Sequence, residues 1–272
     1  MTQTLRVVEW VILGYFISIN SVYLILETLS LLRMTGYLRE RALDDLPRRY
    51  SGHDPLVSIV VPAYNEEAVI EITVKALLQL DYREFEIIVV NDGSTDATVR
   101  EMIERFEMEA VEEGPAEPLP SQPIRAVYRS KRHANLRLLD KENGGKADAL
   151  NAGVNAAVYP LVCGVDADSI LQRDTLRRLA RPFIDDPRTV AVGGTLRVAN
   201  GCKVSDGFFH EAGLSRNVLA LIQVVEYLRA FLFGRFAWDA VNAVLIISGA
   251  LGMFDRETLL RIGGYRKEPA TE

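Results

Sequence analysis

Two aspartates separated by one residue, Asp166 and Asp168, are the side chains of this sequence best placed to do chemistry. They follow the apolar residues 161–165, which we expect to form a buried strand. On an extended chain, residues i and i+2 share a side, so the two carboxylates would repel each other without a cation. Hard oxygen ligands suit Mg²⁺ or Mn²⁺ bridging to a diphosphate. An isolated pair of this kind more often caps a helix, but its place after a buried strand favours a metal site.

Polar side chains also follow two other apolar runs. Asp92 comes after residues 86–90 and before a glycine, where a carboxylate could accept a hydrogen bond from a nucleotide base or ribose. By itself, Asp92 is equally typical of a turn. Tyr64 and Glu66 follow residues 57–61, and the Tyr64 ring could lie along a base or simply pack at a sheet edge.

A lysine follows a glycine-rich segment of the chain. Gly144 and Gly145 precede Lys146 at the expected start of a helix. Glycines allow a close backbone approach, and a helix amino terminus with a lysine suits a phosphate or a sugar diphosphate. Such a loop is weak evidence when taken alone.

The runs that carry these residues alternate with helical patterns. This alternation predicts an α/β fold with a mostly parallel sheet and helices on both faces. Ligands of such sheets bind beyond the carboxyl ends of the strands, so the candidate residues should meet at one edge. A segment rich in proline and acidic residues, 109–123, is predicted to be a surface loop. The expected strands are 57–61, 86–90, 124–128, 136–139, 161–165 and 190–196, and the expected helices are 66–80, a stretch running towards Phe106, 145–157, 174–184 and 223–233.

The amino terminus is predicted to be one transmembrane helix, residues 1–32. Residues 10–26 carry no charge, and a helix over 7–32 adds only Glu9 and Glu27 near its ends. Such a helix spans roughly 30 Å of hydrocarbon. A cleaved signal peptide would need a basic n-region and a small-x-small cleavage site, and neither is present.

The charges that flank this helix predict its orientation. One arginine precedes the helix, whereas several lie in residues 33–55, the expected juxtamembrane connector. The positive-inside rule therefore places the following domain in the cytoplasm, and the same arginines could contact anionic membrane lipid or remain solvated. The flanking arginines are Arg6 on one side and Arg33, Arg39, Arg41, Arg48 and Arg49 on the other.

Composition excludes other classes of protein. The net charge is −6, from 31 basic and 37 acidic residues, so no basic surface is available for nucleic acid. Cys163 and Cys202 are the two cysteines of the chain. This usage is typical of a reducing compartment and does not supply a disulfide framework.

Five ordered segments together resemble the membrane-bound glycosyltransferases of family 2. The similarity covers about residues 55–272 and is strongest to the processive chitin-oligosaccharide, hyaluronan, cellulose and poly-N-acetylglucosamine synthases. It is specific for the family and unspecific for the sugar, and it implies a GT-A fold. The segments are 57–66 (VSIVVPAYNE), 91–96 (NDGSTD), 144–151 (GGKADALN), 166–169 (DADS) and 223–227 (QVVEY).

The resemblance implies roles for individual residues. It assigns Asp166 and Asp168 to the donor and its Mg²⁺ or Mn²⁺, with Asp168 as the direct ligand, and Lys146 to the diphosphate or donor sugar. It places the acceptor beside Ser248, Gly249 and Ala250. The expected donor-binding residues are Pro62, Ala63, Tyr64, Glu66, Asp92, Lys146, Asp166 and Asp168, of which Ala63, Tyr64, Glu66 and Asp92 would hold the uridine.

The same resemblance implies a general base that this chain does not contain. Thr271 and Glu272 match the first two residues of a Thr-Glu-Asp motif, with the catalytic Asp expected directly after Glu272. Glu272 is then on the acceptor side of a catalytic domain, 56–272, that is incomplete at its carboxyl end. We accordingly expect this chain to bind donor without transferring it.

These observations predict an inverting transferase. It would use UDP-N-acetylglucosamine or UDP-glucose to extend a polysaccharide at the cytoplasmic face of a bacterial inner membrane. One alternative is transfer to a polyprenyl-phosphate carrier, and another is a non-catalytic sensor of nucleotide sugars. A nucleotidyltransferase would need a first loop rich in Gly, Arg and Lys, where this chain has Pro62-Ala63-Tyr64-Asn65-Glu66. Residues 223–233 could lie at the membrane interface or pack in a core.

Overall fold

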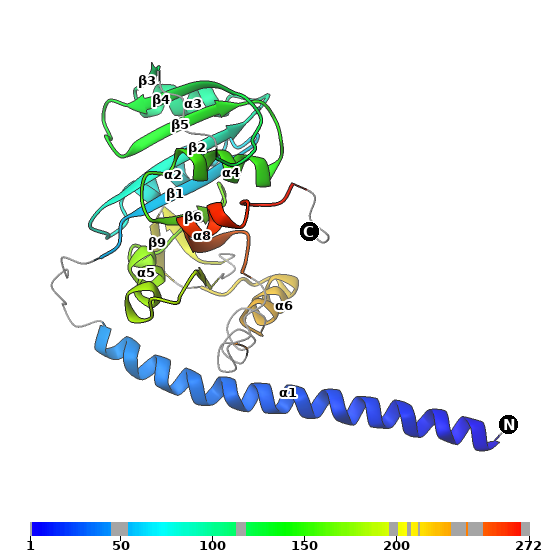
Figure 1. The fold of residues 1–272 in the computed structure, drawn as a ribbon. Coiled ribbons are helices and arrows are strands. Elements are labelled where there is room, and N and C mark those ends of the chain that lie inside the picture. The colour runs from blue at the N-terminus through cyan, green and yellow to red at the C-terminus, as the bar shows by residue number, and fades with distance from the viewer. Residues whose placement is uncertain are drawn as a thin grey trace. The chain divides into compact units, whose positions relative to one another are not determined.

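The computed structural model describes residues 2–44, 54–112, 118–195, 201–205, 208–211, 213–229, 238 and 247–267. These residues divide into two compact units. One unit contains α1 (Thr2–Asp44) and α6 (Val218–Tyr227), and the other contains the sheet and its helices (Figure 1). Glu272 and the rest of residues 268–272 lie outside the described part of the chain.

Helix α1 contains one segment suited to a bilayer. Arg6–Met34 has a mean hydropathy of 1.6 and is long enough to cross a membrane, as the predicted span requires. The helix continues to Asp44, so the first part of the predicted connector is helical. The reason is visible in the sequence, because residues 33–44 contain good helix formers and the first proline of the chain is Pro47.

Helix α6 begins earlier than the predicted helix 223–233. Asn217 precedes it in an extended conformation, and the Asn217 side chain accepts a hydrogen bond from the Leu219 N–H at 2.9 Å. This contact satisfies one of the free donors at a helix start, so Asn217 fixes the beginning of α6. Four apolar side chains of α6 are exposed, namely Val218, Leu219, Ile222 and Val225.

The main sheet has eight strands in the order β3-β4-β5-β2-β1-β6-β10-β7. The predicted parallel arrangement holds for its four central strands, since β1 pairs in parallel with β2 and β6, and β2 pairs in parallel with β5. The outer pairs are antiparallel. The strands are β1 (Val57–Ala63), β2 (Phe85–Asp92), β3 (Met108–Val111), β4 (Ile124–Ser130), β5 (Leu136–Lys141), β6 (Leu161–Val165), β7 (Ala191–Gly193) and β10 (Leu251–Asp255).

Five further helices and a two-stranded sheet complete the description of the second unit. The helices are α2 (Ile70–Leu78), α3 (Thr98–Arg105), α4 (Lys146–Ala156), α5 (Thr175–Asp185) and α8 (Arg256–Arg261). The small sheet pairs β8 (Lys203–Ser205) with β9 (Phe208–Glu211).

Part of the predicted loop 109–123 is a strand. Met108–Val111 pairs antiparallel with β4, from Met108 opposite Ser130 to Val111 opposite Val127. The loop prediction was wrong here because the prolines of this segment begin only at Pro115, which leaves residues 108–111 free to pair at the sheet edge.

Both faces of the sheet are covered. Val60, Ile88 and Leu139 point to one face and pack with Ala149 and Ala152 of α4. Side chains on the opposite face are fully buried as well, so a second layer must cover them, and α2, α3 and α5 each contribute buried residues. The buried side chains of that opposite face are Ile59, Val61, Ile87, Val89, Leu136 and Leu138.

The contact between α4 and β1 leaves no room for a side chain at Gly153. A methyl group there would lie 2.2 Å from Val60 Cγ1. Although Ala is the better helix former, we expect Gly153→Ala to lower the free energy of unfolding by about 1–3 kcal/mol, measured by urea denaturation in detergent. Val60→Ala combined with Gly153→Ala should cost less than the sum of the two single changes. Full stability of Gly153→Ala would contradict this packing.

Candidate functional site

The predicted site residues meet at the carboxyl edge of the central strands. β1, β2, β5 and β6 are parallel neighbours, so their carboxyl ends share this edge. β10 runs antiparallel to β6, with Leu251 opposite Val165, and therefore begins at the same edge. The tertiary structure thus brings the loop before β10, which contains Ser248, Gly249 and Ala250, to the loop that contains Asp166.

Hydrogen bonds join the loops after β1 and β2. Asn65 has a φ of 57°, and its side-chain Oδ1 accepts a hydrogen bond from the Thr95 N–H at 2.9 Å. In the other direction, the Asn65 N–H donates to Ser94 Oγ and the Glu66 N–H donates to Thr98 Oγ1, each at 2.9 Å. These contacts hold Tyr64, whose ring is half exposed, beside the loop that begins with Asp92.

Asp166 and Asp168 lie on a turn that is fixed by two neighbouring elements. Ser169 N–H donates to the Asp166 carbonyl at 3.0 Å, and Thr73 Oγ of α2 donates to the Ala167 carbonyl at 2.5 Å. The Asp166 N–H donates to the Ala250 carbonyl at 3.3 Å. The Asp168 carboxylate is exposed to solvent, where an incoming cation can reach it.

The chemistry of this turn fits a divalent cation. Asp166 Oδ1 is buried and forms an ion pair with Lys146 Nζ at 2.5 Å, although within the described residues it accepts no hydrogen bond. The Lys146 side chain is half exposed, so this ion pair leaves the oxygen available to a metal ion. In the described part of the chain, no three His, Cys, Asp or Glu side chains converge as a complete cage. Such incomplete coordination is usual for Mg²⁺, which is commonly held by one or two carboxylates together with substrate phosphates.

The pKa of Glu66 reflects its burial and the negative charge at this edge. Partial burial raises the pKa of the Glu66 carboxyl group above its ordinary value, and the charges of Asp168, Asp96 and Asp166 raise it further. The three aspartates are therefore close enough to Glu66 to repel its charge. A cation bound at Asp166 and Asp168 would relieve this repulsion.

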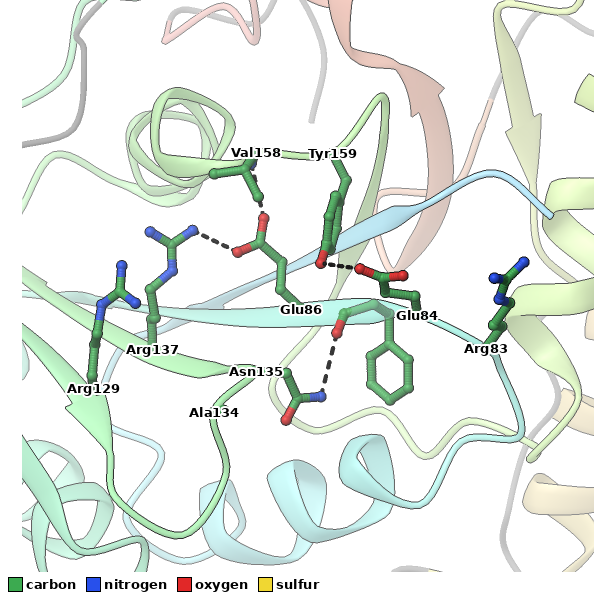
Figure 2. A pocket seen from close by; sticks show the side chains of 10 residues that line it. Arg83, Glu84, Glu86, Arg129, Ala134, Asn135, Arg137, Val158 and Tyr159 are labelled. Carbon is green, nitrogen blue, oxygen red and sulfur yellow. Dashed lines mark hydrogen bonds and ion pairs between the residues drawn. The ribbon is translucent and has the colours of Figure 1, made fainter. Parts of the chain in front are cut away.

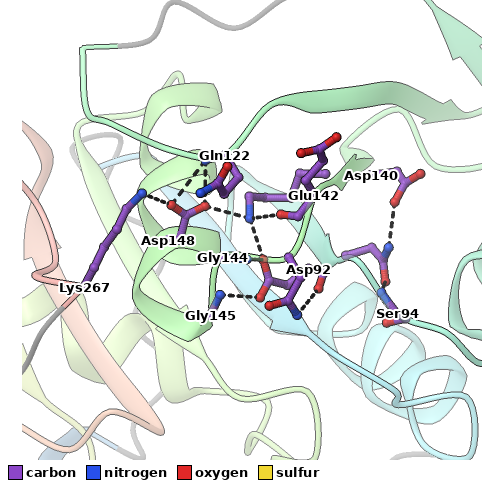
Figure 3. A network of polar contacts seen from close by, with 12 residues as sticks. Asp92, Ser94, Gln122, Asp140, Glu142, Gly144, Gly145, Asp148 and Lys267 are labelled. Carbon is purple, nitrogen blue, oxygen red and sulfur yellow. Dashed lines mark hydrogen bonds and ion pairs between the residues drawn. The ribbon is translucent and has the colours of Figure 1, made fainter.

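Asp92 lies inside a buried polar network (Figure 3). Its carboxylate contacts Lys141 Nζ at 2.5 Å and accepts hydrogen bonds from the N–H groups of Gly144 at 3.0 Å and Gly145 at 2.7 Å. Asn143 Nδ2 donates to the Asp92 carbonyl at 2.8 Å. The structure thus joins the carboxyl end of β2 to the start of α4. The predicted contact of Asp92 with uridine stays a prediction.

The sequence analysis missed three residues of this network. Lys141 and Asp148 are fully buried and lie 2.7 Å apart, and Lys267 forms a second ion pair with Asp148 (Figure 3). Burial opposes ionisation of Asp148, yet the two ammonium groups and the Gln122 N–H outweigh it and lower the pKa of this carboxyl. A lysine that ends an apolar strand, followed seven residues later by an acid among helical apolar residues, was the available signal.

The remaining predicted residues have distinct environments. Pro62 and Ala63 form the last positions of β1, paired with Val90 and Asn91, and Ala63 is buried. Lys146 is the first residue of α4, and its side chain is half exposed. A methyl group added at Gly249 would lie 3.7 Å from Lys146 Nζ, so the loop assigned to the acceptor lies beside the lysine assigned to the donor.

A cavity of about 500 Å³ lies at the opposite, amino-terminal edge of the strands (Figure 2). Both of its acids bind other lining residues. Arg137 contacts Glu86 at 2.6 Å, and Tyr159 Oη donates to Glu84 at 3.2 Å. The cavity contains none of the predicted site residues, and the Glu86–Arg137 ion pair joins β2 to β5 there.

Comparison with sequence families gives one match that covers most of the chain. The model of glycosyl transferase family 2 matches residues 58–115 and 120–221. Curated relatives include a poly-beta-1,6-N-acetyl-D-glucosamine synthase of Staphylococcus epidermidis, which is 26% identical over 87% of this chain and 48% of the relative. The enzyme of the same name from Staphylococcus aureus strain COL is 29% identical over 79% of this chain and 43% of the relative. The chain therefore spans about half the length of the curated relatives it matches.

A solved structure has a similar fold. The mannosyltransferase PcManGT from Pyrobaculum calidifontis, solved in complex with GDP-Man and Mn²⁺, has a TM-score of 0.52 and 23% identity. The similarity covers 89% of this chain and 60% of that protein. It confirms the predicted α/β fold of GT-A type.

Proposed function

Because the chain belongs to glycosyl transferase family 2, we propose that the protein transfers a sugar from a UDP-sugar to a growing glycan. The observation that carries this proposal is the edge at which Asp166, Asp168 and Lys146 meet. Two carboxylates and one ammonium group at the carboxyl ends of parallel strands suit a metal-bound diphosphate.

The nucleoside would lie across the loops after β1 and β2. Tyr64 presents a half-exposed ring for stacking on a base, and Asn65 joins its loop to that of Ser94 and Thr95. Asp92 would supply the acceptor for a uracil N–H. Pro62 and Ala63 would form the floor beneath the base, since both belong to the end of β1.

Asp166 and Asp168 would hold Mg²⁺ or Mn²⁺, with Asp168 as the direct ligand. The bound cation would neutralise the negative charge that develops on the departing UDP. Lys146 would contact the diphosphate or the donor sugar from the first turn of α4, where the helix dipole also favours an anion. Its contact with Asp166 shows that it can reach this position.

The acceptor would bind beside Ser248, Gly249 and Ala250. We propose an inverting displacement in which a general base outside the described residues deprotonates the acceptor hydroxyl. The names of the curated relatives favour N-acetylglucosamine as the sugar and a polysaccharide as the product. UDP-glucose is the second donor to test.

The proposed location is the cytoplasmic face of a bacterial inner membrane. Arg6–Met34 would span the bilayer, and the arginine excess of residues 33–55 would remain in the cytoplasm. UDP-sugars made in the cytoplasm could then reach the carboxyl edge of the sheet directly.

Isothermal titration calorimetry of residues 1–272 in detergent tests the proposal. UDP and UDP-N-acetylglucosamine should bind in the presence of Mn²⁺, and UDP should bind at least about tenfold more weakly in its absence, because the diphosphate would then face Asp166 and Asp168 uncompensated. GDP-mannose is the control for base selectivity and should bind more weakly. UDP affinity that does not change with Mn²⁺ would contradict the metal site, and no UDP binding at all would contradict the proposed function.

A further inference from the structure

We infer that Lys141 is a positioning residue for Asp92 at the base end of the donor site, and that Lys267 couples this positioning to the docking of the segment after α8. The inference rests on the proposed function, because it concerns the affinity for a uridine nucleotide. Neither lysine belongs to the five segments that carry the family resemblance.

Lys141 is buried in the protein interior. Its side chain has no solvent exposure, and its ammonium group contacts Asp92 at 2.5 Å, Asp148 at 2.7 Å and the Glu142 carbonyl at 2.6 Å. Three oxygen partners match the three N–H donors of an ammonium group. A single cation is therefore shared between an acid at the end of β2 and an acid in α4.

The charges of this network balance only when Lys267 is included. Asp92 and Asp148 contribute two negative charges, and Lys141 and Lys267 contribute two positive charges. Breaking a buried ion pair by removing one partner is strongly unfavourable, because the other charge remains without compensation. Without Lys267, the two carboxylates would have to share the one charge of Lys141.

The segment that contains Lys267 docks on α4 through two neighbouring contacts. Asn151 Oδ1 accepts from the Tyr265 N–H at 2.8 Å, and Asn151 Nδ2 donates to the Tyr265 carbonyl at 2.9 Å. Tyr265 also packs edge-on against Phe254 of β10. This docking carries Lys267, which is itself partly exposed, to the buried carboxylate of Asp148.

The other end of the network leads to the proposed donor site. The Asp92 carboxylate holds the N–H groups of Gly144 and Gly145, which immediately precede Lys146. Gly145 has a φ of 87°, so this loop has a conformation that other residues rarely adopt. A shift of Lys141 would therefore move both the acid proposed to bind uracil and the loop proposed to bind phosphate.

The first test replaces Lys141 by Met, which keeps the length of the side chain and removes its charge. In Lys141→Met, Asp148 loses one of the two ammonium groups that lower its pKa, and Asp92 loses the cation that it shares with Asp148, so Lys267 is the remaining charged partner of the pair. Two buried carboxylates that share no cation are less readily charged together. The affinity for UDP-N-acetylglucosamine, whose diphosphate has no terminal phosphate to titrate, should therefore be retained at pH 8 and fall about tenfold towards pH 6, whereas the unmodified protein should show a flat profile over this range.

A second variant separates positioning from mere support of the fold. Lys141→Met combined with Asp148→Asn removes the second buried carboxylate, so the charge of Asp92 is no longer opposed by it, and the flat profile should return. Because the double variant also restores the charge balance of the network, the free energy of unfolding of each variant is measured at both pH values. A purely structural role predicts that the affinity changes only where the protein unfolds, whereas the positioning role predicts a pH-dependent affinity in a Lys141→Met protein that stays folded. If Lys141→Met is folded and binds UDP-N-acetylglucosamine with the affinity and flat pH profile of the unmodified protein, the positioning role is overturned.

The coupling between the segment after α8 and UDP binding is tested at Lys267. This side chain is partly exposed, so its substitution leaves the packing of the core unchanged. Lys267→Met should weaken UDP binding at least about fivefold, a coupling of ordinary size between two sites. Lys131→Met is the matched control, since Lys131 forms an exposed ion pair with Glu109 at the far edge of the sheet, and it should bind UDP normally. Unchanged affinity in Lys267→Met would overturn the coupling. Should Lys141→Met fail to fold, the Lys267→Met result decides the inference.

These outcomes are distinct from a failure of the proposed function. That failure would appear in the unmodified protein as an absence of UDP binding. If the present inference is wrong, the unmodified protein still binds UDP with Mn²⁺. The Lys141→Met and Lys267→Met variants then bind UDP as the unmodified protein does.

Discussion

Asp168→Asn should abolish the dependence of UDP binding on Mn²⁺, with a loss of at least about 100-fold in affinity for the metal. Even residues that only orient a metal ligand cost about 10–100-fold when they are replaced, so a direct ligand should cost no less. The exposed position of Asp168 means that the substitution leaves the core untouched. Calorimetric titration of Mn²⁺ at a fixed UDP concentration measures the affinity for the metal. Titration of UDP with and without Mn²⁺ measures the dependence of UDP binding on the metal.

Asp186→Asn is the matched control for this experiment. Asp186 is also an aspartate on the surface, where it accepts a 2.8 Å hydrogen bond from Arg188 and its charge is compensated. The variant should retain the full response to Mn²⁺. An equal response in Asp168→Asn would show that the metal is held elsewhere, and Asp166 would then be the next residue to replace.

Glu86→Ala should lower the free energy of unfolding by about 3–5 kcal/mol, as expected when one partner of a buried ion pair is removed. The Glu86 carboxylate is buried and accepts hydrogen bonds from Ser58 Oγ at 2.5 Å, Val158 N–H at 2.9 Å and Arg137 at 2.6 Å. Ser58 Oγ and the Val158 N–H would lose this acceptor, and Arg137 would keep its hydrogen bond to the Ala156 carbonyl but lose its ion-pair partner. Since domains are commonly stable by only about 5–15 kcal/mol, this one change would remove a large share of the stability.

Urea denaturation in detergent, followed by circular dichroism, measures this loss. Glu84→Ala is the control, because Glu84 lies two residues away and, among the residues that the structure describes, accepts a hydrogen bond from the Tyr159 hydroxyl alone, in an exposed setting. Its effect should stay within about 0.5 kcal/mol. A similar small effect for Glu86→Ala would mean that the ion pair with Arg137 contributes nothing.

The two edges of the sheet therefore have different tasks. At the amino-terminal edge, the charge of Glu86 is compensated by Arg137 (Figure 2). The carboxyl edge instead gathers Glu66, Asp166 and Asp168, and partial burial together with the charges of the neighbouring acids raises the pKa of Glu66. A bound cation would reduce this repulsion, and the concentration of acids distinguishes the proposed site from the rest of the sheet.

The sequence by itself determined the family, the alternation of strands and helices and the carboxyl-edge placement of the candidate residues. These properties depend on local patterns: apolar runs such as 57–61 and 161–165 form strands wherever both faces are covered, and polar residues directly after them must lie at the edge. It did not determine the antiparallel strands at the margins. β3 and β10 are short, and their pairing depends on partners distant in the chain, such as Ser130 for Met108 and Val165 for Leu251.

The tertiary structure alone decided the surroundings of Asp92. The sequence places this acid after a strand but does not show that it meets Lys141, Asp148 and Lys267. These residues are separated from Asp92 by 49 to 175 positions and meet only when β5 and α4 pack and the segment after α8 docks. Charged side chains are normally exposed, so no periodic pattern predicts that a lysine and two acids will be buried together. Their ion pairing becomes favourable only after the fold has removed all of them from water, and it is therefore a property of the assembled structure.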